Sequence, residues 1–320
     1  IKMANLIIII SKAVACMNRV DSIFKVESSI EDKGRHGSRK PGSQNSGSQN
    51  SGSQNPGPQN SGPQNPALRI PKVEFKDMEF VYAGAKEPAL KDISFCAMAG
   101  QTIGVIGGTG SGKSTLVNLI PRFYDAASGQ VLVDGTDVKE YSLDELRDKT
   151  GVVPQKSVLF KGTLRDNMRW GKQDASDEEI YRALDTAQAR EFVDSKGEGL
   201  DLYIDQGGHN LSGGQRQRLT IARALVRRPE ILIMDDSASA LDFATDARLR
   251  KAIRENTGDM TVFIVSQRAT TIKSADTILV LDEGRLAGMG THKELLKDCQ
   301  VYREICLSQL SKEEVERDEQ

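Results

Sequence analysis

Short apolar runs separated by glycine-rich turns predict a parallel α/β core. Residues 102–106, 231–234 and 261–265 read TIGVI, ILIM and TVFIV. Runs of this length without strict alternation are typical of strands buried on both faces of a parallel sheet. A looser alternation from Val73 to Tyr82 predicts a further strand upstream of them. The chain therefore begins its folded part with strands and returns to strands after residue 231.

The middle of the chain, about residues 143–225, has the pattern of helices instead. Leu219, Ala222 and Leu225 recur at helical spacing behind Ser212, and Ser176 with Glu179 has the spacing of a capping box. Farther on, Asp282-Glu283-Gly284 predicts a hairpin turn between strands at 277–281 and 286–289. The charged tail at 311–320 is expected to be frayed.

A glycine-rich segment follows the first apolar run and matches the phosphate-binding pattern G-x-x-x-x-G-K-[ST]. Glycines let successive backbone N–H groups point inward around phosphates, and the start of the following helix, expected near Leu116, adds partial positive charge. Lys113 would reach the β- and γ-phosphates, and Ser114 would ligate Mg²⁺. The candidate phosphate-binding residues are Gly107, Gly108, Thr109, Gly110, Ser111, Gly112, Lys113, Ser114 and Thr115.

The apolar run at 231–234 ends in two acidic residues, Asp235 and Asp236. Ligands of open α/β sheets bind beyond the carboxyl ends of the strands, so these side chains are expected in the same crevice as the phosphate loop. Asp235 fits the second Mg²⁺ contact of a P-loop ATPase.

A third motif, Leu211-Ser212-Gly213-Gly214-Gln215, stands at the start of a predicted helix. Together with the phosphate loop and Asp235, it resembles the ATP-binding cassette (ABC) family from about residue 73 to 310. The resemblance implies a P-loop NTPase α/β core with an antiparallel β subdomain and an inserted helical subdomain. It also implies that Ser212, Gly213, Gly214 and Gln215 bind the γ-phosphate of an ATP held by a second cassette.

The same resemblance assigns further positions. Tyr82 occupies the place of the aromatic residue that stacks on adenine, with an ordinary strand aromatic as the alternative. Gln155 matches the loop glutamine that reaches Mg²⁺ and senses the transmembrane domain. Residues 239–242 match the loop that crosses the dimer interface, and Gln267 lies at the switch position.

Two positions depart from the family pattern. Asp236 stands where a glutamate normally orients the attacking water, and Gln267 stands where a histidine normally contacts the γ-phosphate. Aspartate is one methylene shorter, and a misplacement of about 1 Å costs on the order of 100-fold in rate. Glutamine donates a hydrogen bond but carries no charge. Both changes together resemble the slow ATP site of a heterodimeric ABC exporter.

The ends of the cassette have a different composition. An apolar stretch at 3–16 is shorter than the roughly 20 residues that span a bilayer. It is expected to be the end of a transmembrane helix. Residues 1–41 would then be a fragment that contains this helix end and its junction to the cassette. A signal peptide ending at Cys16 is the alternative. Residues 42–66 are five G-[SP]-Q-N-[SP] repeats, expected to be a disordered linker with a span of roughly 25–30 Å. The cassette then covers 67–310.

Composition excludes some classes of protein. With 43 Lys and Arg against 45 Asp and Glu, the net charge of −2 indicates no nucleic-acid surface. Cys16, Cys96, Cys299 and Cys306 have neither metal-ligand nor disulfide spacing, so free thiols are expected.

The leading hypothesis is an ATPase subunit that drives an ABC exporter of multidrug or lipid type from the cytoplasmic side of the cell membrane. Its cofactors would be ATP and Mg²⁺. Its partners would be a second cassette, in a heterodimer, and the transmembrane domain of the same polypeptide. The alternatives are a homodimeric exporter with Asp236 as its base, a non-transport ABC ATPase, and a regulatory nucleotide-binding module.

Overall fold

The computed structural model describes residues 2–24, 30, 32, 70–237 and 240–319. The predicted linker at 42–66, the interface-loop position Ser239 and much of the 1–41 junction lie outside the described residues. The chain divides into two units, residues 1–33 and 34–320.

The first unit contains helix α1 (Lys2–Phe24). Its described side chains from Ile10 onward are exposed, including Met17 and Phe24. Among the described residues, no helix combines the length and the apolar character that a membrane crossing requires. The expectation that residues 1–41 hold the end of a transmembrane helix stays a prediction.

The second unit is built on a six-stranded sheet with the strand order β12-β11-β3-β10-β9-β6. All neighbours in this sheet are parallel except the edge hairpin β11–β12. Its strands are β3 (Thr102–Gly107), β6 (Thr150–Val153), β9 (Ile231–Asp235), β10 (Thr261–Val265), β11 (Thr277–Asp282) and β12 (Arg285–Gly290). The three apolar runs of the sequence are the central strands β3, β10 and β9, as predicted.

Both faces of this sheet are buried, which explains the absence of alternation. Ile231 and Ile233 pack in one apolar cluster, with α2 (Lys113–Asn118) and the β subdomain. Leu232 and Met234 pack in the other, with the helical subdomain and α9 (Ala269–Ile272). Each of the four apolar residues of β9, 231–234, therefore meets an apolar partner whichever way it points.

Two smaller sheets complete the β structure. An antiparallel sheet has the order β2-β1-β4-β5, and β7 pairs with β8. The strands are β1 (Val73–Phe80), β2 (Leu90–Ala97), β4 (Ser128–Val133), β5 (Thr136–Asp137), β7 (Gly162–Thr163) and β8 (Tyr203–Ile204). The expected antiparallel β subdomain is confirmed.

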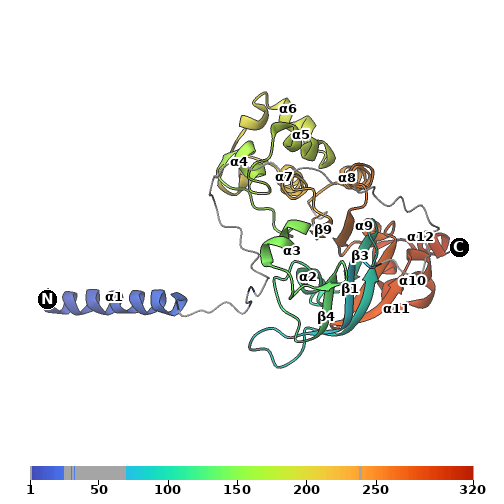
Figure 1. The fold of residues 1–320 in the computed structure, drawn as a ribbon, viewed down its shortest axis with the longest axis horizontal. Helices are drawn as coiled ribbons and strands as arrows, with labels where there is room; N and C mark the ends of the chain where they lie inside the picture. The colour runs from blue at the N-terminus through green and yellow to red at the C-terminus, as the bar shows by residue number, and fades with distance from the viewer. Residues whose placement is uncertain (1, 25–29, 31, 33–69, 238–239, 320) are drawn as a thin grey trace, which may run out of the picture. The chain divides into compact units, whose positions relative to one another are not determined.

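Helices group between β6 and β9, which confirms the inserted helical subdomain (Figure 1). They are α4 (Leu164–Arg169), α5 (Asp177–Thr186), α6 (Arg190–Ser195) and α7 (Gly213–Leu225), with short 3₁₀ turns at Gly199–Asp201 and Gln206–Gly208. Ser176 and Ser212 cap α5 and α7 through capping boxes with Glu179 and Gln215. The remaining helices are α3 (Leu143–Lys149), α8 (Phe243–Asn256), α10 (His292–Asp298), α11 (Gln300–Gln309) and α12 (Lys312–Glu319).

The expectation of a frayed tail is wrong, because residues 312–319 form α12. Ser311 and Glu314 exchange side-chain-to-backbone hydrogen bonds of 3.2 and 3.0 Å at its start. Val315 is fully buried in the apolar cluster, and Asp318 lies 3.4 Å from Lys273. One buried valine and an S-x-x-E spacing were the sequence signals that the high charge of the tail obscured.

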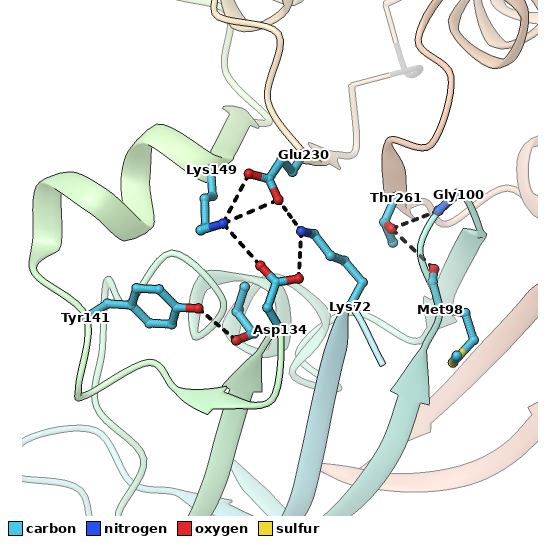
Figure 2. A network of polar contacts seen from close by, with 9 residues as sticks. Lys72, Met98, Gly100, Asp134, Tyr141, Lys149, Glu230 and Thr261 are labelled. Carbon is cyan, nitrogen blue, oxygen red and sulfur yellow. Dashed lines mark hydrogen bonds and ion pairs between the residues drawn. The ribbon is translucent and has the colours of Figure 1, made fainter. Parts of the chain in front are cut away.

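An ion-pair network joins the antiparallel sheet to the parallel one (Figure 2). Lys72, directly before β1, lies 2.8 Å from Asp134 and also pairs with Glu230, directly before β9. Lys149, at the end of α3, bridges the same two carboxylates at 3.1 Å each. The two cations and two carboxylates balance in charge, so the four groups join four segments of chain without leaving a net charge at the junction.

We expect this network to make stability fall in acid. The hydrogen bond from Lys72 holds the pKa of Glu230 below its ordinary value. Burial favours a higher pKa for Asp134, but the hydrogen bonds from Lys72 and Lys149 outweigh it and lower that pKa. A lowered carboxylate pKa contributes stability that is present above the unfolded pKa and is lost as pH falls through the folded one.

Glu230→Gln should therefore lower the unfolding free energy at pH 7 by about 1 kcal/mol, a modest value because the Glu230 side chain is half exposed. The difference from wild type should begin to shrink as pH falls below about 4.3, the unfolded carboxyl pKa, and should vanish only below the lowered folded pKa. Thermal melts across pH measure it, with Glu87→Gln, whose carboxylate is 86% exposed and 3.5 Å from Lys91, as the matched control. An equal loss for both variants would contradict a role for the network.

Candidate nucleotide-binding site

The candidate residues gather because four parallel strands end at one edge of the sheet. Val105 of β3 and Asp235 of β9 are both register partners of Val265 of β10. Val153 of β6 pairs with Met234 in turn. The loops that follow these strands therefore start side by side, and they carry the phosphate loop, Asp236, Gln267 and Gln155.

The phosphate loop is open on one side and closed on the other. Gly108, Thr109 and Gly110 are exposed, and Gly110 has a φ of 82°. A Cβ atom at Gly107 would lie 2.0 Å from the Leu281 carbonyl oxygen, so the close approach of β11 requires glycine there. Helix α2 begins at Lys113, earlier than the expected start near Leu116. Its first turn therefore faces the loop directly.

Lys113 is 8% exposed and donates to the carbonyl oxygens of Gly107 and Gly108 at 3.0 and 2.7 Å. Burial lowers the pKa of its ammonium group, while the charges of Asp236 and Asp235 act in the opposite direction. Ser111 Oγ is also buried, with no hydrogen-bond partner among the described residues. A buried cation and an unsatisfied hydroxyl in one glycine-rich loop fit a phosphate group, which would supply the missing acceptor oxygens.

The acidic residues lie as the sequence predicts. Ser114 donates to Asp235 at 3.0 Å, so the two predicted Mg²⁺ ligands are in contact. Burial raises the pKa of Asp235, and the charge of Asp236 raises it further. A bound cation would relieve this cost. No group of three or more His, Cys, Asp or Glu side chains in the described ranges could hold a metal by itself, so Mg²⁺ here would need phosphate oxygens as further ligands.

Gln155 reaches the same place from β6. Its side-chain amide donates to Asp236 at 3.3 Å. The Asp236 backbone has a φ of 42°, and its N–H donates to the Val265 carbonyl at 2.9 Å. The residue is thus tied to β10 at its backbone and to the Gln155 loop at its side chain.

Tyr82 lies beyond the end of β1, not within a strand, and 39% of it is exposed. Its hydroxyl is 2.7 Å from Thr115 Oγ1, which places the ring beside the phosphate loop. Tyr124 meets it edge-on with ring centroids 5.4 Å apart. Sequence reasoning missed Tyr124; its position soon after the phosphate-loop helix was the only available signal.

The motif residues Ser212–Gln215 lie at the start of α7, in the helical subdomain (Figure 1). In the described parts of the chain they make no hydrogen bond to residues 107–115. Ser212 is exposed, and Gly213 and Gly214 are half-buried. One chain therefore does not bring its own motif to its own phosphate loop.

Two further contacts were not anticipated from the sequence. Ser157, two residues after Gln155, donates to Gln217 of α7, so the Gln155 loop is joined to the motif helix. The rings of Phe160 and Trp170 are in tilted contact, 4.9 Å between centroids, and are 44% and 68% exposed. The loop after Gln155, through Phe160, and the end of α4, through Trp170, thus present an aromatic surface to solvent.

Comparison with known proteins identifies the family. Residues 90–239 match the ABC transporter family profile. The chain is 49% identical over 233 residues to an ABC transporter ATP-binding protein of Mycobacterium tuberculosis, covering 72% of this chain and 40% of that protein. It is 43% identical over 240 residues to an ATP-dependent lipid A-core flippase of Haemophilus influenzae, covering 75% of this chain and 41% of that protein.

A solved structure agrees with these relatives. It is a bacterial Atm1-family ABC exporter with ATP bound, 38% identical, with a TM-score of 0.72 over 78% of this chain and 44% of that one. The chain thus spans about two fifths of the length of the relatives it matches. The expected fold is confirmed, and the chain belongs to the ABC transporter family and carries its ATP-binding domain.

Proposed function

We propose that this chain is the ATP-binding and ATP-hydrolysing part of an ABC exporter. The observation that carries the proposal is the meeting of Lys113, the Ser114–Asp235 pair and the Gln155–Asp236 pair at one edge of the sheet. The similarity to a flippase and to an exporter favours transport over a non-transport ABC ATPase or a purely regulatory module.

The residues divide the work of holding Mg-ATP. The loop N–H groups, Lys113 and Ser111 bind phosphate oxygens, and Thr115 holds the Tyr82 ring beside them. Ser114, Asp235 and Gln155 would hold Mg²⁺, which would neutralise charge on the phosphates. Asp236 accepts a hydrogen bond from the attacking water, and Gln267 donates one to the γ-phosphate.

The position of Ser212–Gln215 argues for a second cassette. These residues form a helix start with an exposed N-cap, as in an anion site, but make no hydrogen bond to residues 107–115 of their own chain. A partner cassette facing them would complete two sites between two chains. We infer a heterodimer in which the site at Lys113 is slow, because Asp236 is short and Gln267 is uncharged; a homodimer that uses Asp236 as its base is the second candidate.

The aromatic surface near Gln155 fits a membrane domain. Phe160 and Trp170 are large exposed rings, and the guanidinium of Arg223 lies 5.7 Å from the Phe160 ring centroid. Because Ser157 joins this loop to α7 and Gln155 joins it to Asp236, force on the surface would reach both halves of an ATP site. The proposed location is the cytoplasmic side of the cell membrane, with a multidrug or lipid substrate.

Tyr82 variants test the nucleotide assignment. Tyr82→Ala should weaken Mg-ATP binding by about 1–3 kcal/mol through loss of base stacking. Tyr82→Phe keeps the ring and loses only the hydrogen bond to Thr115, so it should bind nearly as well as wild type. Calorimetric titration with ATP, and with triphosphate lacking the base, measures the difference. Equal affinity of Tyr82→Ala and wild type for ATP would remove Tyr82 from the site.

A further inference from the structure

The switch segment, residues 266–272, contains a short helix whose N-cap residue cannot accept a hydrogen bond from the helix backbone. Helix α9 (Ala269–Ile272) follows Gln267 and has Arg268 at its N-cap position, without a side-chain cap. A guanidinium group has donors only, so it cannot accept a hydrogen bond from the first N–H groups of a helix. Some other acceptor must satisfy the backbone at this point.

Gln309, the last residue of α11, provides that acceptor from 40 residues away. Its Oε1 accepts from the Ala269 N–H at 2.9 Å, and its Nε2 donates to the Gln267 carbonyl at 2.7 Å. The orientation of the amide follows from its partners, since a backbone N–H can only donate and a carbonyl can only accept. One side chain thus holds the backbone on both sides of Arg268.

Other contacts hold the chain before and after the segment that Gln309 bridges. Before it, at the end of β10, Ser266 N–H donates to Val105 of β3 at 3.1 Å, and Val265 accepts from Asp236 N–H at 2.9 Å. After it, α11 packs on α9, and Lys273, directly after α9, pairs with Asp318 of α12. The exposed Gln267 lies between an anchored strand end and a helix start that Gln309 caps.

We propose that Gln309 is a positioning residue that sets the backbone of the switch residue Gln267 for contact with the terminal phosphate. The C-terminal helix α11 thereby becomes part of the machinery that distinguishes a triphosphate from a diphosphate. This inference rests on the proposed function, because it assumes that the γ-phosphate lies within reach of Gln267.

Three variants of the full chain test it by titration with Mg-ATP and Mg-ADP. Gln309→Met removes both hydrogen bonds. Gln309→Glu keeps an acceptor for Ala269 but loses the donor to Gln267. Gln300→Met, on the same helix, removes only an exposed hydrogen bond to Glu304 at 2.8 Å and serves as the control.

The preference for ATP over ADP should fall about fivefold or more in both Gln309 variants, with ADP affinity within about twofold of wild type. In a Gln267→Ala background, Gln309→Met should cause no further loss, because the side chain that it positions is absent. The control should bind both nucleotides like wild type. Any turnover should fall through kcat with KM little changed.

Other outcomes contradict the inference. If Gln309→Met lowers only the melting temperature, or if its effect adds fully to that of Gln267→Ala, Gln309 has a structural role alone. An unchanged ATP preference in Gln309→Glu would show that the bond to Gln267 does not matter. Failure of the wild-type chain to bind Mg-ATP, or wild-type affinity in Lys113→Ala, would instead overturn the proposed function, and the two failures are thus distinguishable.

Discussion

Replacing Lys113 by alanine is expected to weaken Mg-ATP binding by about 100-fold or more. The side chain is buried in the phosphate loop and would give charge-assisted hydrogen bonds to phosphate oxygens, each worth about 1.5–3 kcal/mol. Its present partners, the carbonyl groups of Gly107 and Gly108, are weaker acceptors than a phosphate. Phosphate binding also restores charge compensation to an ammonium group whose pKa burial has lowered.

Titration of the full chain with Mg-ATP and with adenosine separates the affinity due to the phosphates from the affinity due to the nucleoside. Lys113→Ala should lose affinity for the triphosphate and leave the weak affinity for adenosine unchanged. Lys91→Ala is the control, since it removes a lysine whose side chain pairs with Glu87 at 3.5 Å. This variant should bind like wild type. Unchanged ATP affinity in Lys113→Ala would show that the phosphates bind elsewhere.

The sequence could predict the elements that depend on local rules. The unalternating runs at 102–106, 231–234 and 261–265 became central parallel strands because such a strand must be apolar on both sides. Ser176 and Ser212 cap helices because a serine side chain satisfies a backbone N–H that no helix can satisfy internally. The meeting of Ser114 with Asp235 follows from the same parallel topology.

The features that the sequence did not predict depend on contacts between distant segments. Gln309 reaches Ala269 across 40 residues, and Ser157 reaches Gln217 across 60. The periodicity of apolar residues along the chain does not predict contacts between residues so far apart. The tail was misjudged for the same reason: its charges are typical of a solvated segment, and only the core behind Val315 explains why α12 forms. The local sequence pattern thus predicts the strands and helices, whereas packing between distant segments determines how the loops of the site are held in place.

The slow-site proposal predicts that Asp236→Glu combined with Gln267→His raises turnover by up to about 100-fold. The longer carboxylate moves about 1 Å toward the attacking water, and misplacement of this size costs on the order of 100-fold. The imidazole can place positive charge near the γ-phosphate. Both groups act on one transition state, so the gains of the single variants need not add.

The backbone at residue 236 sets a cost against this gain. Its φ of 42° lies in the left-handed region, where aspartate is tolerated better than glutamate. Asp236→Glu should therefore lose about 1 kcal/mol of stability while it gains activity. A gain in turnover accompanied by a lower melting temperature would argue that Asp236 fits the backbone at the expense of catalysis.

The measurement is the steady-state ATPase rate of the chain without a partner cassette, at concentrations where two copies can pair, compared among wild type, the double variant and Asp236→Asn. Wild type should be slow, the double variant faster, and Asp236→Asn no faster than wild type, because an amide cannot take a proton from water. A typical enzyme turns over at about 10 s⁻¹. If wild type already reaches that rate and Asp236→Asn abolishes it, Asp236 is a competent base. The slow site would then be excluded, and two copies of this chain facing each other through Ser212 and Lys113 would be the functional dimer.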